Sequence, residues 1–152
     1  MFKRVVMTIL LLTSTVTANE RHQMNFYNNI SRAGYTPGLA YLYLYGENFG
    51  WELGGNYGLG SSTANVSYES FSANLLVTYR TKIDKKQTFM IKVGPSYREY
   101  TAIHNTLNST ITNTEISYYN YGFDYLYDLK SYGKIGFNYF ADAFGIVYRI
   151  KF

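Results

Sequence analysis

The sequence contains no cysteine, and it has only two histidines, two prolines and one tryptophan in 152 residues. Without cysteine the chain cannot be held together by disulfide bonds. Two histidines without cysteine leave few ligands for a metal site, because zinc is bound mainly by these two side chains. The two histidines, His22 and His104, also lie far apart in the sequence. We therefore expect no metal and no other cofactor.

Long hydrophobic runs and a strong net charge are also missing. After the first 18 residues no apolar run approaches the ~18 residues that a membrane-spanning helix needs. The net charge is +4, and the basic residues are scattered except for Lys82, Lys85 and Lys86 in one expected turn. These observations exclude a helical membrane protein and argue against a nucleic-acid partner.

The amino terminus has the composition of an export signal. A basic start at Lys3 and Arg4 is followed by apolar residues 5–12 and by small residues up to Ala18. About eight apolar residues are too few to cross ~30 Å of hydrocarbon as a helix. A basic start, a short apolar stretch and small residues at the cleavage site define a secretory signal peptide. We predict that residues 1–18 are this signal peptide.

Aromatic residues are abundant, with 18 Tyr and 10 Phe, and they recur at every second position. The last ten residues show the pattern most clearly, with Arg149 and Lys151 on the face opposite the aromatic one. Alternate side chains of a strand point to opposite faces, so such a strand has one apolar face. We predict a barrel-closing strand whose outer face carries Phe144, Ile146, Tyr148, Ile150 and Phe152.

The same alternation predicts eight strands within a single domain of residues 19–152. Single-chain bacterial barrels have an even number of strands. The expected fold is therefore all-β, an eight-stranded antiparallel up-and-down transmembrane β-barrel in the bacterial outer membrane. Pro95 lacks a backbone donor, which predicts a bulge or a local break of the fifth strand at this residue. The expected strands are residues 24–30, 39–45, 49–57, 71–80, 89–98, 119–127, 134–139 and 143–152, with long external loops at 32–38, 58–67 and 101–114.

The opposite faces of these strands carry charged residues of both signs. In a soluble barrel the apolar face would point inward and the charges outward, whereas in a membrane barrel the aromatic faces meet lipid. The membrane arrangement fits these aromatic faces better. A barrel of eight strands has an interior that side chains can fill. We predict a plugged lumen with a structural ionic network, the alternative being a narrow ion path. The network residues are Glu52, Lys92, Arg98, Asp124, Lys134 and Arg149.

Four short motifs resemble the OmpX/Ail-like family of small outer-membrane barrels. They are GLAYLYLY at 38–45, VGPSYR at 93–98, YGFDY at 121–125 and GIVYR at 145–149. The chain departs from the family by adding Ile150-Lys151 before its last aromatic residue. The resemblance implies an eight-stranded barrel, in some members with strands that protrude as an external sheet, used in adhesion, host-cell entry or complement resistance. No binding residue is carried over.

The third external loop is the expected site of contact with an external ligand, because exposed loops on a rigid scaffold commonly carry function. Tyr100, His104 and Asn108 are its candidate residues. His104 with Ser109 could suggest a lipid-modifying enzyme, but the sequence places no carboxylate beside them. We predict a non-enzymatic protein for surface interaction or envelope integrity, with a minor channel or a lipid-modifying enzyme as the alternatives. The expected partners are outer-membrane lipid and lipopolysaccharide, the barrel-assembly machinery, which would read the C-terminal strand, and a host or extracellular ligand.

Overall fold

The computed structural model of the chain describes residues 21–31, 34–63, 66–104, 109–140 and 143–151. The predicted signal peptide, Asn108 of the third loop and Phe152 of the closing strand therefore lie outside the described residues.

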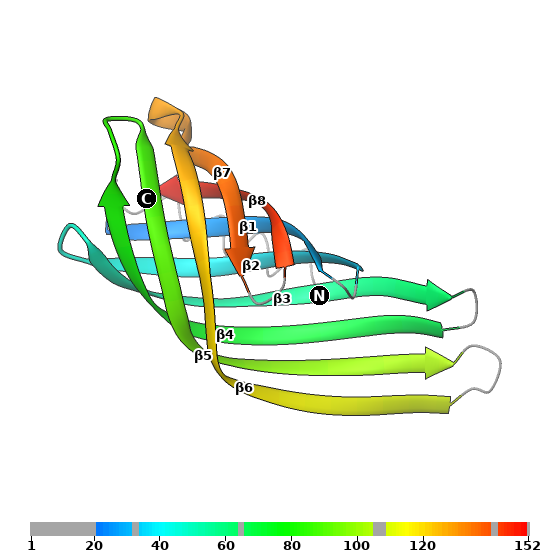
Figure 1. Cartoon of the computed structure of the whole chain (residues 1–152). Helices are drawn as coiled ribbons and strands as arrows, with labels where there is room; N and C mark the ends of the chain where they lie inside the picture. Colours follow the sequence, from blue (N-terminus) through cyan, green and yellow to red (C-terminus); the bar gives the residue numbers. More distant parts are fainter. Residues whose placement is uncertain (1–20, 32–33, 64–65, 105–108, 141–142, 152) are drawn as a thin grey trace, which may run out of the picture.

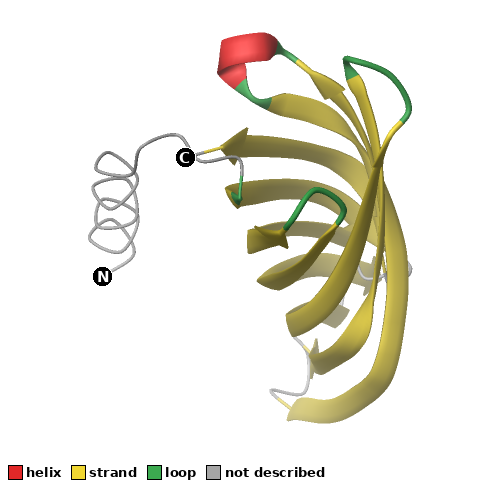
Figure 2. Cartoon of the chain, turned by 90° about the vertical axis from the view of Figure 1, so that its left-hand side faces the viewer, coloured by secondary structure: helices red, strands yellow, loops and turns green. Residues whose placement is uncertain are grey.

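Almost all of the described chain is β-strand (Figure 2). The one exception to strand and turn is η1 (Lys130–Tyr132), a single turn of 3₁₀ helix before β7. Among the described residues no helix is long and apolar enough to cross a membrane. The strands are β1 (His22–Ser31), β2 (Gly34–Tyr45), β3 (Phe49–Thr63), β4 (Val66–Lys82), β5 (Gln87–His104), β6 (Ser109–Asp128), β7 (Lys134–Phe140) and β8 (Ala143–Lys151).

Each strand pairs antiparallel with its neighbour in sequence, and β8 pairs with β1 to close the barrel (Figure 1). The closing register places Phe26 opposite Tyr148 and Asn25 opposite Arg149. Closure leaves no unpaired edge along the barrel itself, which is what a sheet surrounded by lipid requires. The predicted fold class, an eight-stranded antiparallel barrel, is confirmed.

Side chains alternate between the barrel interior and its outer surface as the sequence pattern predicts. On β4, for example, Leu75 and Val77 are exposed, whereas Leu76 and Thr78 are buried. The outer surface is apolar along every strand. Its exposed large side chains include Phe26, Trp51, Leu53, Phe71, Leu75, Val77, Ile91, Val93, Phe123, Phe137, Phe144 and Ile146.

The external loops are much shorter than the sequence suggested, and this part of the prediction is wrong. Residues expected in loops continue the strands: β2 already begins at Gly34, and the hairpins of β3–β4 and β5–β6 are paired out to Thr63↔Val66 and His104↔Ser109. Serine, threonine and asparagine suggested loops, but residues 101–103 and 110–112 of the β5–β6 hairpin combine Thr with Ile, which both favour strands. Pairing in a hairpin also satisfies their backbone hydrogen bonds.

The strands of one half of the barrel extend well beyond the strands of the other half (Figure 1). β2 pairs with β3 only as far as Leu59, and β7 pairs with β6 only between Gly122 and Asp128. Beyond these points β3, β4, β5 and β6 continue as a four-stranded sheet. We call residues 60–63, 66–70, 99–104 and 109–117 the protruding sheet.

A register shift marks the place where β5 and β6 leave the barrel. Gly94 pairs with Asn120, but Ser96 pairs with Ser117, so β6 contains one extra residue opposite Pro95. The irregularity expected at Pro95 is found there, but the bulged strand is β6 and not β5. Bulges bend a sheet and increase its twist, and β5 and β6 bend strongly along their length in Figure 1.

Candidate functional site

A cluster of buried ions lies in the barrel lumen, and Asp124 of β6 is at its centre. Its side chain is fully buried. Asp124 Oδ1 lies 2.8 Å from Nζ of Lys92 on β5, and Oδ2 lies 2.7 Å from Nη2 of Arg149 on β8. Lys92 and Arg149 are each 1% exposed. The carboxylate therefore forms ion pairs with two cations from two different strands.

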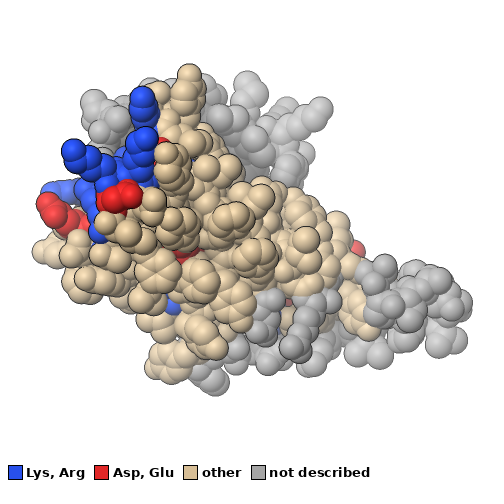
Figure 3. Space-filling model, turned by 45° about the horizontal axis from the view of Figure 1, so that its top comes forward, with Lys and Arg blue, Asp and Glu red and all other residues tan. Residues whose placement is uncertain are grey.

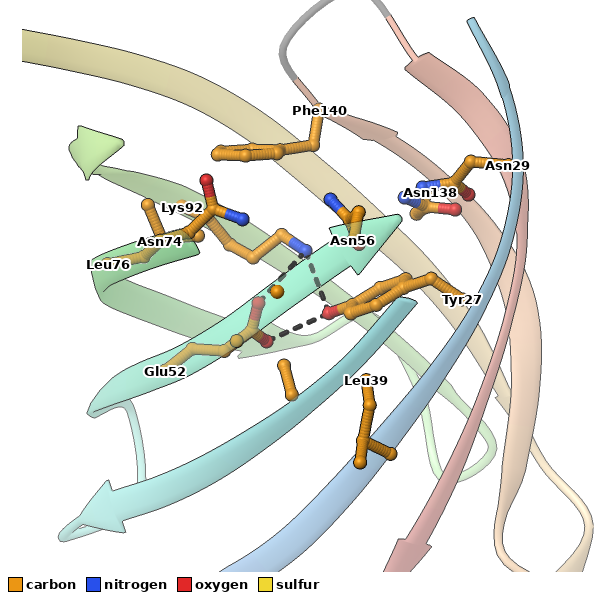
Figure 4. Close-up of a pocket in the computed structure, with 13 residues that line it drawn as sticks. Tyr27, Asn29, Leu39, Glu52, Asn56, Asn74, Leu76, Lys92, Asn138 and Phe140 are labelled. Carbon is orange, nitrogen blue, oxygen red and sulfur yellow. Dashed lines mark hydrogen bonds and ion pairs between the residues drawn. The ribbon is translucent and has the colours of Figure 1, made fainter. Parts of the chain in front are cut away.

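Glu52 of β3 completes the cluster through a hydrogen-bonded tyrosine. Glu52 Oε1 lies 3.6 Å from Lys92 Nζ. Glu52 Oε2 accepts hydrogen bonds from the Tyr27 hydroxyl at 2.9 Å and from Asn25 Nδ2 at 2.5 Å. Lys92 Nζ in turn donates to the Tyr27 hydroxyl at 3.0 Å (Figure 4). We call Glu52, Lys92, Asp124 and Arg149 the lumen cluster.

The charges of the lumen cluster sum to zero, with two carboxylates against two cations. The ions hold further polar partners, since Arg149 Nε donates to Asn25 Oδ1 at 2.5 Å. Lys92 Nζ also lies 4.6 Å from the centre of the Tyr27 ring. Buried charges are tolerated when they are paired and hydrogen-bonded in this way. The cluster cross-links strands β1, β3, β5, β6 and β8 through the interior of the barrel.

Apolar side chains fill the lumen beside the cluster on its turn side. Leu42, Leu44 and Met90 are fully buried and contact one another, and Leu126 packs with Val147. The space left is small. A cavity lined by Glu52, Lys92 and Tyr27, among other residues, holds about 10 Å³ (Figure 4), and a second one at the protruding end holds about 20 Å³. Each has room for about one water molecule, so in the described residues the lumen is filled by side chains.

Two of the six predicted network residues lie apart from the lumen cluster. Arg98 is six residues further along β5 than Lys92, which is about 20 Å of strand. It is half-buried, and its Nη1 donates to the Tyr100 hydroxyl at 2.8 Å. Lys134 lies at the opposite end, where its Nζ donates to Thr88 Oγ1 at 2.8 Å and lies 3.8 Å from Asp128 Oδ2. The six predicted ions thus lie at three different heights along the barrel axis.

Sequence reasoning missed three polar residues of the lumen. Tyr27 and Asn25 bind the Glu52 carboxylate from β1, and Arg80 donates through Nε and Nη2 to the Glu47 carbonyl oxygen at 2.9 and 2.6 Å. The alternation did place Asn25, Tyr27 and Arg80 on inner faces. Tyrosine, however, was interpreted only as a lipid-facing residue, and the partners of these residues depend on strand register.

The predicted contact residues of the third loop are mostly strand residues. Tyr100 and His104 belong to β5, so their assignment to a loop is wrong, and Asn108 lies outside the described residues. Tyr100 lies opposite Ser70 and Asn113 in the protruding sheet. His104 and Ser109 are directly opposite each other in the β5–β6 register. Among the described residues there is no group of His, Asp and Glu that could hold a metal ion.

Apolar surface outside and paired ions inside define a class of protein. Monomeric soluble proteins rarely expose contiguous apolar surface of more than a few hundred Å². Here exposed aromatic and aliphatic side chains follow all eight strands. Aromatic residues also pack on one another across the strands of this surface, as Tyr43 and Tyr41 do against Trp51. This is the architecture of a small barrel of the outer-membrane type.

The solved structures that this chain resembles include two such barrels. Neisserial surface protein A aligns with a TM-score of 0.60 at 10% identity, over 86% of this chain and 94% of that one. Ail, the attachment invasion locus protein of Yersinia pestis, aligns with a TM-score of 0.55 at 11% identity, over 85% of this chain and 97% of that one. Both are small eight-stranded outer-membrane barrels of the OmpX/Ail family, so the resemblance expected from the sequence is confirmed at the level of the fold. No family profile and no curated protein matches the sequence.

Proposed function

We propose that the chain is a small bacterial outer-membrane barrel whose protruding sheet binds a protein partner outside the cell. The apolar outer surface supports insertion into lipid, and the filled lumen supports a role other than transport. The orientation follows from the connections. Outer-membrane barrels direct their short turns to the periplasm and their longer segments to the exterior. The protruding sheet is then external.

The observation that carries this proposal is a free strand edge. Residues 109–121 of β6 pair with β5 on one side, and among the described residues no strand pairs with them on the other side. Figure 1 shows this part of β6 at the margin of the protruding sheet. An unpaired edge presents backbone N–H and C=O groups that can add a strand from another protein. We call these residues the free edge.

The charges near the protruding sheet favour a protein over a sulfated glycan as the partner. Ail has also been solved in complex with the heparin analogue sucrose octasulfate, a polyanion, and that structure aligns with a TM-score of 0.53 at 11% identity, over 85% of this chain and 97% of that one. In this chain the described outer ends of β4 and β5 carry Glu69 and Glu99 against Arg98. A polyanion would be repelled by this excess of carboxylates, whereas backbone pairing at an edge does not depend on basic residues.

Shortening the β5–β6 hairpin tests the proposal. Residues 101–112 are removed and Tyr100 is joined to its cross-strand partner Asn113 through an Asn-Gly turn. This removes the first part of the free edge and leaves the barrel strands intact. In the matched control, residues 61–67 are removed, and Gly60 is joined to its partner Tyr68 by the same turn. The control shortens the opposite margin of the sheet and keeps the free edge.

Both variants are expressed in a non-adherent bacterial strain, and their closed barrels are verified by heat-modifiable gel mobility. We expect the β5–β6 variant to lose adhesion to cultured host cells and the control to keep it. Adhesion that survives removal of residues 101–112 would refute a role for the outer part of the free edge, residues 109–112.

A further inference from the structure

The turn end of the barrel carries a compact group of lysines that neither the lumen nor the protruding sheet involves. Lys82, Lys85 and Lys86 lie at the β4–β5 turn, and Lys130 lies at the β6–β7 connection. All four side chains are exposed. Figure 3 shows Lys and Arg side chains gathered at this end of the molecule. We call these four residues the basic face.

Hydrogen bonds hold the two turns of the basic face against each other. The backbone N–H of Asp128 donates to the Lys86 carbonyl oxygen at 2.7 Å. Within the first turn, Asp84 Oδ1 accepts the backbone N–H groups of Lys86 and Gln87 at 2.6 and 2.7 Å. In the second, Asp128 Oδ1 accepts the backbone N–H of Lys130 at 2.8 Å. The lysines are therefore displayed from one fixed surface.

The nearby carboxylates are engaged elsewhere. Asp84 caps its own turn, and Asp128 Oδ2 lies 3.8 Å from Lys134 Nζ and 3.7 Å from Lys151 Nζ. Among the described residues none of the four lysines has a carboxylate within ion-pair distance. The basic face thus carries four positive charges against the one carboxylate of Asp84, which leaves a net positive charge.

The margin of the apolar surface meets the basic face directly. Ile83, in the same turn as Lys85, is 58% exposed, and Tyr132, next to the Lys130 turn, is 76% exposed. Lys86 Nζ lies 5.9 Å from the centre of the Tyr127 ring, which faces outward on β6. Exposed aromatic rings next to cations are typical of the level of lipid headgroups. A soluble polyanion makes no use of apolar residues beside the lysines, whereas lipid contacts both the cations and the apolar residues.

We propose that the basic face binds the phosphate groups of anionic phospholipids in the membrane leaflet at the turn end. This leaflet is the periplasmic one in the orientation given above, so the inference rests on the proposed function for the barrel's insertion. The opposite end of the molecule carries Glu69 and Glu99. The two ends therefore differ in the sign of their charge, and the basic face fixes the depth and orientation of the barrel in the membrane.

Spin-labelled lipids measure this preference in the intact barrel. The protein is reconstituted in phosphatidylcholine vesicles that contain a trace of spin-labelled phosphatidylglycerol or spin-labelled phosphatidylcholine. The motionally restricted fractions give the relative association constant. A lysine near an anionic surface contributes about a fivefold change in affinity. The measured relative association constant is an average over all the lipids around the barrel. We expect it to favour phosphatidylglycerol at least about twofold in the wild type.

Replacing all four lysines (K82Q/K85Q/K86Q/K130Q) should reduce the relative association constant to about one, and the matched arginine variant (K82R/K85R/K86R/K130R) should keep the wild-type value. An equal preference in wild type and glutamine variant contradicts the proposal. So does lysine-dependent binding of soluble polyphosphate without any preference for phosphatidylglycerol. Failure of the proposed insertion is distinguished by gel mobility, because the protein would then form no heat-modifiable barrel in either lipid.

Discussion

Replacing Asp124 by Asn tests the energetic role of the lumen cluster. The Asp124 carboxylate holds Lys92 at 2.8 Å and Arg149 at 2.7 Å, and both cations are 1% exposed. Asparagine has nearly the same shape, so the packing is preserved while the charge is lost. The cluster then holds one carboxylate, Glu52, against two cations.

The expected cost follows from the burial of the cations. Breaking a buried ion pair by removing one partner costs about 3–5 kcal/mol, because the other charge remains buried without compensation. Lys92 keeps Glu52 Oε1 at 3.6 Å and the Tyr27 hydroxyl at 3.0 Å. Among the described residues Arg149 keeps only neutral partners, Asn25 Oδ1 and Met90 Sδ. We therefore expect Asp124→Asn to lower the free energy of unfolding by about 3 kcal/mol or more.

Equilibrium unfolding in urea, with the barrel in phosphatidylcholine vesicles, measures this free energy. Fluorescence of Trp51, which lies on the outer face of β3, and heat-modifiable gel mobility provide two independent signals. The control is the cycle of Asp124→Asn, Lys92→Met and the double variant. The double variant retains one carboxylate and one cation, so its loss should be smaller than the sum of the single losses by about 0.5–3 kcal/mol. A loss below about 0.5 kcal/mol for Asp124→Asn, the level of ordinary surface substitutions, would refute the assigned role.

Two further predictions concern the lumen and the packing of the sheet. Planar-bilayer recordings of the wild type should show no large, stable single-channel current, because side chains fill the lumen. Such a current would contradict the filled lumen. Glu52→Gln should lower the stability of the barrel without opening a conductance. Gly136→Ala should lower the free energy of unfolding by about 1–3 kcal/mol, since a Cβ at Gly136 would lie 1.8 Å from the Tyr125 carbonyl oxygen. Gly55→Ala is the milder comparison, because its Cβ would lie 2.9 Å from the nearest atom, the Ser72 carbonyl oxygen, which is still a close approach. Its loss should be smaller than that of Gly136→Ala, and an equal or larger loss would show that the approach to Tyr125 is not responsible.

The strand number and the orientation of the faces could be predicted from the sequence because both depend on local alternation. Each strand shows its own two-residue period, and one apolar face per strand determines which side meets lipid. The lengths of the strands could not be predicted in the same way. Residues 101–104 and 109–114 contain threonine, isoleucine and asparagine, and only their pairing across the hairpin decides between a loop and an extended strand.

Which of the inward-facing ions contact one another depends on the register of the strand pairing, and the sequence does not specify this register. The pattern placed Glu52, Lys92, Asp124 and Arg149 on inner faces, but it placed Arg98 there as well. The pairing of Lys92 with Gly122 and of Asp124 with Asn138 sets the level of each ion along the barrel. A strand advances about 3.4 Å per residue. A register difference of a few residues therefore decides whether two charged side chains lie within ion-pair distance.

A spin-label scan along β4 tests most directly whether the apolar surface meets lipid. The sequence has no cysteine, so single cysteines can be introduced at each position from Ala73 to Tyr79 and labelled in the vesicle-bound barrel. Collision rates with oxygen, which concentrates in lipid, should peak at Ala73, Leu75, Val77 and Tyr79 and fall at Asn74, Leu76 and Thr78. High oxygen collision at the second set, or no two-residue alternation at all, would contradict a barrel with its aromatic face in lipid and its ions in a filled lumen.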